Sequence, residues 1–212
     1  MTDLTAPALA LPLLGWATHS LWMARRLRVA RTDPLTGLPT RDAFTSRALR
    51  ATTRPGISVL LLDLNHFKHV NDSHGHAAGD TLLAAVGQRL QQWCTELGGF
   101  AGRLGGDEFA AVADLGDSST NATAHDLVHL LQQSVDINDS TALVPQVSIG
   151  ICRPDDRPGL PLAARLRAAD EAMYAAKSLG TRWRYAAPQS THATVAGRRA
   201  GRHGTHASLP TR

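Results

Sequence analysis

The residues with the clearest chemical potential are two adjacent acids, Asp107 and Glu108, which directly follow the Gly105–Gly106 pair. The pair lies between two apolar-rich segments, 100–104 and 109–113. A Gly-Gly pair between strand-like runs is typical of a tight hairpin, because both turn positions require positive φ. Small turn residues also let a large anionic ligand approach the backbone. The acids beside this turn therefore indicate a site for a metal and a phosphate; the alternative is a surface hairpin with solvated acids.

A third acid, Asp63, lies near the end of a continuous apolar run, Ile57–Leu64, which is typical of a buried strand. A carboxylate in such a place is costly unless it is paired or binds a cation. If the hairpin lies beside this strand, Asp63 and Asp107 converge on one point. Carboxylate and carbonyl oxygens there would suit Mg²⁺ or Mn²⁺ that also binds substrate phosphates. We prefer this interpretation to the alternative, in which Asp63 caps the following turn.

The composition is that of a globular domain with extensions, with 212 residues, 43% of them hydrophobic, and a net charge of +4. Two isolated cysteines, Cys94 and Cys152, have no metal-binding spacing and fit a reducing compartment. Arginine carries nearly all the basic charge, and the only lysines are Lys68 and Lys177, which indicates that a compact ammonium is required at those positions. The arginines are dispersed and aromatic residues are few, so we expect no nucleic acid as a partner.

The N-terminal segment has a different character from the rest of the chain. Residues 4–24 carry no formal charge and are followed by a basic cluster, Arg25–Arg28. This stretch is long enough to cross a bilayer as a helix, with the arginines keeping the remainder in the cytoplasm. An apolar helix that packs against a second copy of the chain is the alternative. We divide the chain into this segment (1–31), a domain (32–186) and a basic tail expected to be disordered (187–212).

The domain alternates helices and strands, which predicts an α+β sheet with helices on its faces. Thr40 is a suitable N-cap for the first helix, and Gly180 is suited to end the last one. Besides the hairpin, the patterns predict helices over 41–51, 77–93, 122–135 and 162–179 and strands over 57–64, 144–152 and 183–186.

Six short motifs occur one after another along this domain. They are Asp33-Pro-Leu-Thr-Gly-Leu-Pro-Thr-Arg41, Leu62-Asp-Leu-Asn-His-Phe-Lys-His-Val-Asn-Asp72, Gly75-His-Ala-Ala-Gly-Asp80, Arg103-Leu-Gly-Gly-Asp-Glu-Phe109, Val147-Ser-Ile-Gly150 and Ala169-Asp-Glu-Ala-Met-Tyr-Ala-Ala-Lys177. Together they resemble the GGDEF family, the diguanylate cyclases, over about residues 32–186. The resemblance implies the palm-like fold of nucleotidyl cyclases, a mostly antiparallel central sheet flanked by helices.

The resemblance also implies a reaction. Each domain of the family binds one GTP, and two domains meet as a homodimer to form cyclic di-GMP and two pyrophosphates. Each 3′-hydroxyl attacks the α-phosphate of the other GTP, with two Mg²⁺ or Mn²⁺ ions per site. By the match, Asp63, Asp107 and the carbonyl of Leu64 would be metal ligands, and Glu108 would be the second acid near the attacking hydroxyl.

The substrate-binding residues follow from the same match. Guanine selection falls to Asn71 and Asp80, because a carboxylate accepts from the N1–H and 2-amino donors that adenine lacks. Lys68 and Lys177 match the contacts to the triphosphate, and Phe67 belongs to the same binding set. Asp80 could instead stabilise the first turn of a helix, and Lys177 could complement a helix macrodipole.

Three positions depart from the family pattern. Asn65 stands where many members carry a second Asp, a change that we expect to be tolerated. Thr181 stands where members often carry Arg, so Arg182 is expected to take its place at the triphosphate. Glu96–Gly99 replaces the Arg-x-x-Asp run of the inhibitory product site, and this predicts no product inhibition there, since an acid cannot clamp a phosphate as Arg does.

Three functions are therefore compared. The first is an active cyclase with a cytoplasmic catalytic domain. The second is a GTP-binding domain that regulates a partner without chemistry. The third is a membrane-tethered scaffold that would behave identically after Asp107→Ala.

Overall fold

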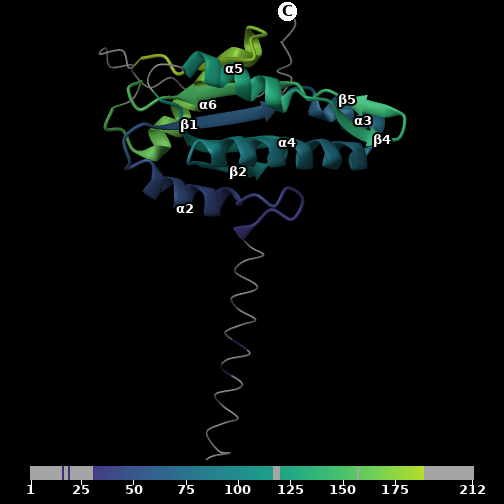
Figure 1. Ribbon diagram of the computed structural model, residues 1–212, viewed down its shortest axis with the longest axis horizontal. Helices are drawn as coiled ribbons and strands as arrows, with labels where there is room; N and C mark the ends of the chain where they lie inside the picture. The colour runs from purple at the N-terminus through teal and green to yellow at the C-terminus, as the bar shows by residue number, and fades with distance from the viewer. Residues whose placement is uncertain (1–15, 17–18, 20–30, 117–119, 157, 189–212) are drawn as a thin grey trace, which may run out of the picture.

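The computed structural model describes Trp16, His19 and residues 31–116, 120–156 and 158–188 (Figure 1). In chain order its elements are α2 (Arg41–Ala51), β1 (Ile57–Leu64), α3 (Phe67–His74), α4 (His76–Glu96), β2 (Phe100–Gly105), β3 (Glu108–Asp114), α5 (Thr120–Leu131), β4 (Val135–Asn138), β5 (Thr141–Leu143), β6 (Val147–Cys152), α6 (Leu162–Ser178) and β7 (Trp183–Tyr185).

The central sheet has the strand order β2-β3-β1-β6-β7. β1 is antiparallel to both of its neighbours, β3 and β6, and only the β6–β7 pair is parallel. β4 and β5 form a separate two-stranded hairpin. The predicted α+β palm-like fold, a mostly antiparallel sheet flanked by helices, is confirmed.

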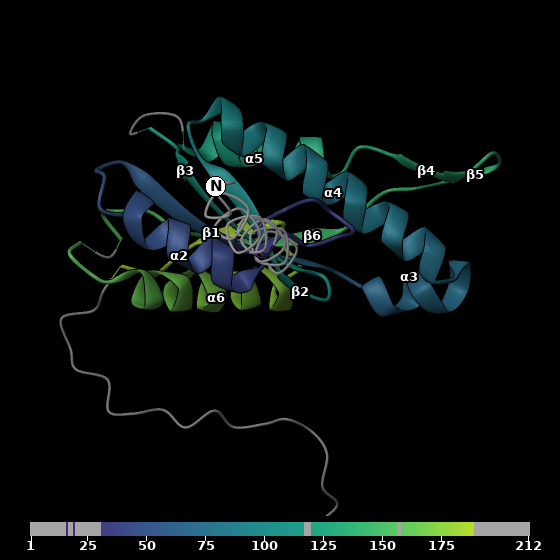
Figure 2. The same cartoon turned by 90° about the horizontal axis from the view of Figure 1, so that it is seen from below.

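The apolar run of β1 is continuous because the strand is buried on both faces. Leu60, Leu62 and Leu64 belong to the core under α4 and α5, whereas Val59 and Leu61 face the core under α2 and α6. Figure 2 shows α4 and α5 on one side of the sheet and α2 and α6 on the other. β1 is therefore the central strand of the sheet, and a charged side chain at its C-terminal end has a neighbouring strand on each side.

Gly150 sets how closely α6 approaches the sheet. A Cβ at this position would lie 1.9 Å from the carbonyl oxygen of Ala169 and 2.4 Å from the backbone nitrogen of Met173. Only glycine therefore lets the backbone of α6 rest directly on β6. This contact brings the last turn of α6 to the end of β1.

The predicted boundaries of α2 and β1 are confirmed, whereas the helix predicted over 77–93 extends to Glu96 and two further boundaries are wrong. The predicted helix over 122–135 ends at Leu131, and Val135 begins β4. The hairpin turn there is closed by an amide hydrogen bond from Ser140 to Asn138 Oδ1, 3.0 Å, a local interaction that competes with helix. The strand predicted from residue 144 begins at Val147.

α3 was not predicted, because its eight residues include only two apolar side chains, Phe67 and Val70, too few for a helical pattern to be recognised. Apart from Trp16 and His19, the predicted segment 4–24 lies outside the described residues, as does most of the predicted tail. Within the described part of the chain, no helix has the length and apolar character needed to cross a membrane.

Candidate active site

The two aspartates predicted to converge come from neighbouring strands. In the register of β1 and β3, Asp63 lies opposite Glu108. The Leu64 amide donates to the carbonyl oxygen of Asp107 at 3.3 Å, so the turn of the hairpin is attached to the end of β1. The chain therefore presents the carboxylates of Asp63 and Asp107, together with the backbone of Leu64, at the C-terminal end of the central strand.

The turn itself lies one residue later than predicted. Gly105 still pairs with Glu108, after a bulge in β2, so Gly106 and Asp107 form the corner. Both glycines do have positive φ, 140° and 54°, as expected. Asp107 thus belongs to the turn rather than to the strand that follows it.

Arg103 holds this turn in place. Its Nε and Nη2 donate to the carbonyl oxygen of Gly106 at 3.0 and 2.7 Å. Its Nη1 lies 3.1 Å from both carboxylate oxygens of Asp33. Asp33 also accepts from the amide and hydroxyl of Thr36, at 2.8 and 2.6 Å. The loop before α2 is thereby linked to the acidic turn.

The acid pair is incompletely neutralised. The ammonium of Lys177, in the last turn of α6, contacts Asp63 Oδ2. Burial raises the pKa of Asp107, and the negative charge of Asp63 raises it further, although a backbone hydrogen bond to its carboxylate and the charges of Lys177 and Arg103 act in the opposite direction. A divalent cation would relieve the repulsion between these two neighbouring carboxylates.

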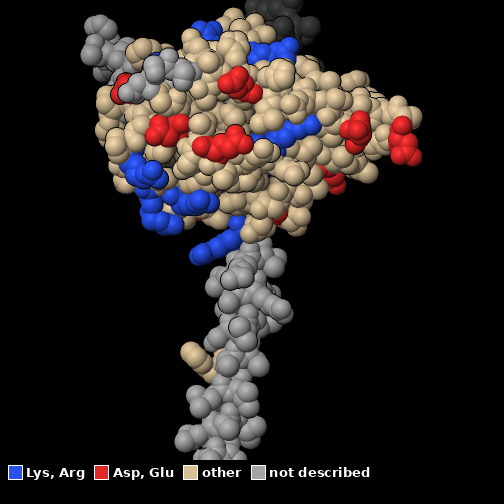
Figure 3. All heavy atoms as spheres, in the orientation of Figure 1, with Lys and Arg blue, Asp and Glu red and all other residues tan. Residues whose placement is uncertain are grey.

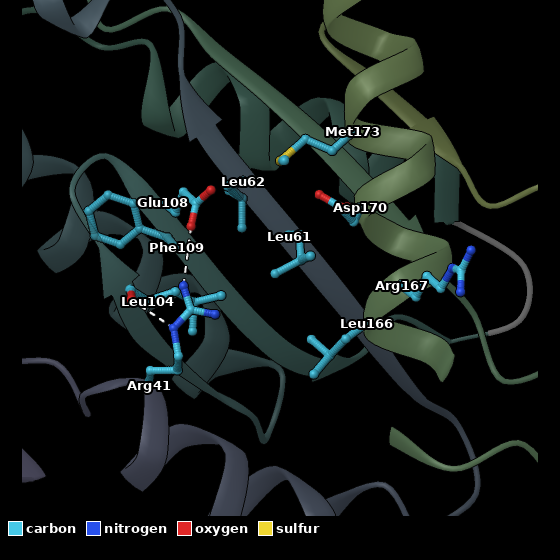
Figure 4. A pocket seen from close by; sticks show the side chains of 10 residues that line it. All are labelled: Arg41, Leu61, Leu62, Leu104, Glu108, Phe109, Leu166, Arg167, Asp170 and Met173. Atoms are coloured by element: carbon cyan, nitrogen blue, oxygen red, sulfur yellow. Dashed lines mark hydrogen bonds and ion pairs between the residues drawn. The ribbon is translucent and has the colours of Figure 1, made fainter. Parts of the chain in front are cut away.

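Glu108 points away from this pair toward α2. Its Oε2 lies 3.3 Å from Arg41 Nη2, and Arg41 Nε donates to the carbonyl oxygen of Leu104 at 3.0 Å. Arg41 and Glu108 lie at one end of a cavity of about 340 Å³ between α2 and α6, with Asp170 and Met173 across from them (Figure 4). Arg41 therefore spans both strands of the acidic hairpin.

Figure 3 shows further basic side chains gathered over α2, with acidic side chains beside them; exposed Arg47 and Arg50 belong to this helix. Sequence reasoning assigned no role to Arg41 or Arg103. Both stand inside quoted motifs, and that position was the only signal that could have found them.

The residues predicted to select guanine lie where α3 meets α4. A Cβ on Gly79 would be 2.0 Å from Asn71 Oδ1 and 3.1 Å from Phe67 Cζ, so both side chains lie against this glycine. Asp80 follows it directly and is exposed. The structure thus brings Asn71 and Phe67 together against Gly79, the residue that precedes Asp80 in α4.

The segment between β1 and α3 connects the two groups of residues. His66, the N-cap of α3, has a left-handed backbone with φ of 58°, and exposed Lys68 lies in the first turn of the helix. Asn65 is tied to β6, since its Oδ1 accepts from Ser148 Oγ at 3.0 Å. At the position where many family members carry Asp, the amide of Asn65 is therefore fixed by this hydrogen bond to Ser148.

Arg182 is not brought to the acid pair. Its Nη1 contacts Gln132 Oε1, which follows α5 on the opposite face of the sheet from α6. The Thr181 amide donates to Ala176 O at 2.9 Å and the Gly180 amide to Lys177 O at 3.3 Å, which closes the C-terminus of α6. Thr181 therefore has a structural role at the end of the helix.

The donor set fits a metal that shares its coordination with substrate. In the described ranges, no three or more His, Cys, Asp or Glu side chains cluster as a metal site. Mg²⁺ is usually held by one or two carboxylates plus substrate phosphates, rather than by a full protein cage. Asp63 and Asp107, with the carbonyl of Leu64, provide this smaller set.

Comparisons with known proteins identify the class. The family model described as "Diguanylate cyclase, GGDEF domain" matches residues 30–182. A crystal structure of the coiled coil and GGDEF domain of DgcB from Caulobacter crescentus, in complex with c-di-GMP, covers 87% of this chain and 100% of that chain, with a TM-score of 0.74 and 27% identity. The chain belongs to the GGDEF family.

Individual relatives differ in how far they are characterised. An uncharacterised 19.3 kDa protein of Streptomyces ambofaciens is 49% identical over 182 residues, 85% of this chain and 96% of that protein. The diguanylate cyclase TpbB of Pseudomonas aeruginosa is 37% identical over 155 residues, 70% of this chain but only 35% of that protein. Other relatives are named cyclic di-GMP phosphodiesterases, and the chain again spans a minor part of their length.

Proposed function

We propose that the protein is a diguanylate cyclase that condenses two GTP molecules into cyclic di-GMP and two pyrophosphates across a homodimer. The observation that carries this proposal is the convergence of Asp63, Asp107 and Lys177 at the end of the central strand. The proposal is supported by the family, which links the chain to cyclic di-GMP synthesis. GTP as substrate would place the reaction in the cytoplasm.

The metal would be held by the Asp63 and Asp107 carboxylates and the Leu64 carbonyl. Two Mg²⁺ or Mn²⁺ ions, when bound, would supply neutralising charge at the phosphate oxygens and lower the pKa of the attacking hydroxyl. Half-buried carboxylates with incomplete compensation are suited to this task, because an added cation is stabilised there rather than repelled.

The chain's own residues would position the nucleotide. Asn71 and Asp80 bind the guanine edge, with Phe67 beside the base, and Lys68 and Lys177 bind the triphosphate. Glu108, held by Arg41, would accept the proton of the 3′-hydroxyl. In each half-reaction the bond between the 3′-oxygen and the α-phosphorus forms. The bond from this phosphorus to the bridging oxygen breaks, and pyrophosphate leaves.

A second candidate is a GTP-binding regulator with little or no turnover. This candidate is favoured by two contacts: Arg182 contacts Gln132, and the Thr181 amide donates a hydrogen bond at the end of α6. Lys68 and Lys177 then remain as the basic residues proposed to bind the triphosphate. Electrostatic stabilisation of the transition state would then be weaker than in members that carry Arg at this position.

Chromatographic separation of products from purified full-length protein with GTP and Mg²⁺ decides between the two candidates. Cyclic di-GMP formed by the wild type but not by Asp107→Ala establishes the cyclase. Measurable GTP binding without product, in a protein shown to be dimeric, supports the regulator. ATP in place of GTP is the matched control for the guanine contacts.

A further inference from the structure

The side chain of Lys177 has a partner that its proposed role does not require. Its ammonium contacts Asp63 Oδ2 across the end of the sheet. The side chain of Asp63 is 14% exposed, whereas that of Lys177 is 48% exposed. The carboxylate is therefore fixed in the protein, and the cation reaches it from the solvent side.

The backbone at both ends of this contact is fixed. Gly150 lets α6 rest on β6, and the hydrogen bonds from Gly180 and Thr181 close the last turn of the helix. Asp63 is held between Glu108 and Ser148 in the strand register. Only the flexible four-carbon side chain of Lys177 is free to change partner.

One carboxylate oxygen cannot serve an ammonium and a divalent cation equally well at the same time. A cation that enters between Asp63 and Asp107 would repel Lys177, and a bound triphosphate would offer Lys177 another anionic partner.

We propose that Lys177 alternates between Asp63 and the triphosphate, so that binding of the divalent cation and of the nucleotide are coupled through one side chain. This inference rests on the proposed function for the identity of both ligands. Without nucleotide, Lys177 competes with the metal at Asp63. With nucleotide, Lys177 moves to the phosphates and releases Asp63 for the metal.

In this coupling, nucleotide and metal tighten each other's binding, an effect that a lysine with a purely structural role would not produce. Linkage requires that nucleotide tightens metal binding by the same factor by which metal tightens nucleotide binding, about 5- to 150-fold in typical couplings. Lys177→Met removes the competitor and the phosphate contact together. It should therefore bind metal alone more tightly than the wild type, yet bind nucleotide more weakly.

The test is titration of Mn²⁺ followed by the paramagnetic resonance signal of the free ion. It is done without nucleotide, and again with a saturating GTP analogue whose α,β-bridge is a methylene group and which therefore cannot release pyrophosphate. The Mn²⁺ that the analogue chelates without protein is measured in parallel and subtracted. Wild type, Lys177→Met, Lys177→Arg and Lys68→Met are compared, each with its folding checked by circular dichroism. Lys68 is the matched control, since it is the other lysine and lies on α3.

We expect Lys177→Met to bind Mn²⁺ alone at least about fivefold more tightly, and to lose most of the gain that the analogue produces in the wild type. Lys177→Arg, which keeps the charge, should resemble the wild type without nucleotide, and Lys68→Met should leave Mn²⁺ binding alone unchanged. Unchanged or weaker Mn²⁺ binding by Lys177→Met overturns the inference, as does wild-type Mn²⁺ affinity that does not respond to the analogue. If the Mn²⁺ effects appear but the wild type makes no cyclic di-GMP, the exchange stands and the cyclase proposal fails.

Discussion

Asp33 and Asp107 both lie near Arg103, but the pKa of Asp33 is lowered and the pKa of Asp107 is raised. Asp33 accepts hydrogen bonds from the amide and hydroxyl of Thr36 and from Arg103. Burial alone would raise its pKa, but these hydrogen bonds lower it below the ordinary value. Burial also acts on Asp107, where the charge of Asp63 adds to it and the pKa is raised.

The difference separates a structural carboxylate from a reactive one. The oxygens of Asp33 are satisfied within the protein, so its charge strengthens the connection between the loop before α2 and the acidic turn. The carboxylate of Asp107 accepts a hydrogen bond from its own backbone amide and lies beside a second acid, and its pKa is raised despite that hydrogen bond. A folded protein retains such a destabilising arrangement where a ligand is needed to complete it.

The sharpest test of this comparison is Asp107→Asn. We expect cyclic di-GMP formation to fall by about a hundredfold to a thousandfold, the scale of losing one charge-stabilising group in an enzyme site. The melting temperature at neutral pH should rise, since the amide removes repulsion with Asp63. Product chromatography and thermal unfolding measure the two effects. A variant that is both inactive and less stable than the wild type would show that Asp107 stabilises the fold, against the comparison.

Gly79→Ala extends the comparison to a polar side chain that is positioned by shape. Its Cβ would lie 2.0 Å from Asn71 Oδ1, so the amide must move from its place against Gly79. We expect GTP affinity to fall by about ten- to a hundredfold, the cost of one or two misplaced polar contacts. Fluorescent nucleotide binding measures this loss. Mn²⁺ binding without nucleotide should remain at the wild-type value, and a parallel loss of both would indicate a general disruption of the fold.

Asp33→Ala tests the other half of the comparison. Removing the acceptor of Arg103 and Thr36 should lower the free energy of unfolding by about 2–3 kcal/mol, as expected for hydrogen bonds to a charged group. The side chains of Arg103 and Asp33 are only 14% and 18% exposed, so solvent screening reduces this effect little. Chemical denaturation measures it, with exposed Asp126→Ala on α5 as the matched control. Equal stability of the two variants would contradict the structural role of Asp33.

The two aspartates also predict opposite dependences of stability on pH. The lowered pKa of Asp33 contributes stability that is present above the unfolded value of roughly 3.9 and is lost as pH falls through the folded value. The raised pKa of Asp107 contributes stability below that unfolded value, which is lost as pH rises through the folded one. The deficit of Asp33→Asn and the gain of Asp107→Asn should therefore both be largest near neutral pH and shrink on acidification. Denaturation curves at several pH values test this, and a gain for Asp107→Asn that grows in acid would reverse the assignment.

Features that depend on residues close together in the sequence were predicted, whereas contacts between residues far apart in the sequence were not. β1 was predicted to the residue because its apolar run is local, and the Asp63–Asp107 convergence followed from two strand ends. Arg41 and Arg103 were missed as contacts because their partners Glu108 and Asp33 lie 67 and 70 residues away, and no local pattern announces such a pair.

The same limit applies to Arg182. It was expected at the triphosphate but contacts Gln132, 50 residues earlier in the chain. α3 was missed for a different reason, since its eight residues carry only two apolar side chains, Phe67 and Val70, and so short a pattern does not distinguish a helix from a loop.

The smallest expected effect concerns the corner after α4, where the family's inhibitory product site would lie. Glu96 stands there in place of Arg, and a Cβ on Gly99 would lie 1.9 Å from the carbonyl oxygen of Val112, so the Asp of the family motif does not fit on this backbone. Added cyclic di-GMP should therefore leave turnover unchanged at saturating GTP, both in the wild type and in Glu96→Arg.

Competition at the active site itself would be relieved by more GTP, and steady-state rates at several GTP concentrations separate the two cases. Inhibition that saturating GTP does not relieve would show that the chain keeps a product site outside the catalytic pair. The contrast between satisfied and reactive charges would then not account for how its activity is controlled.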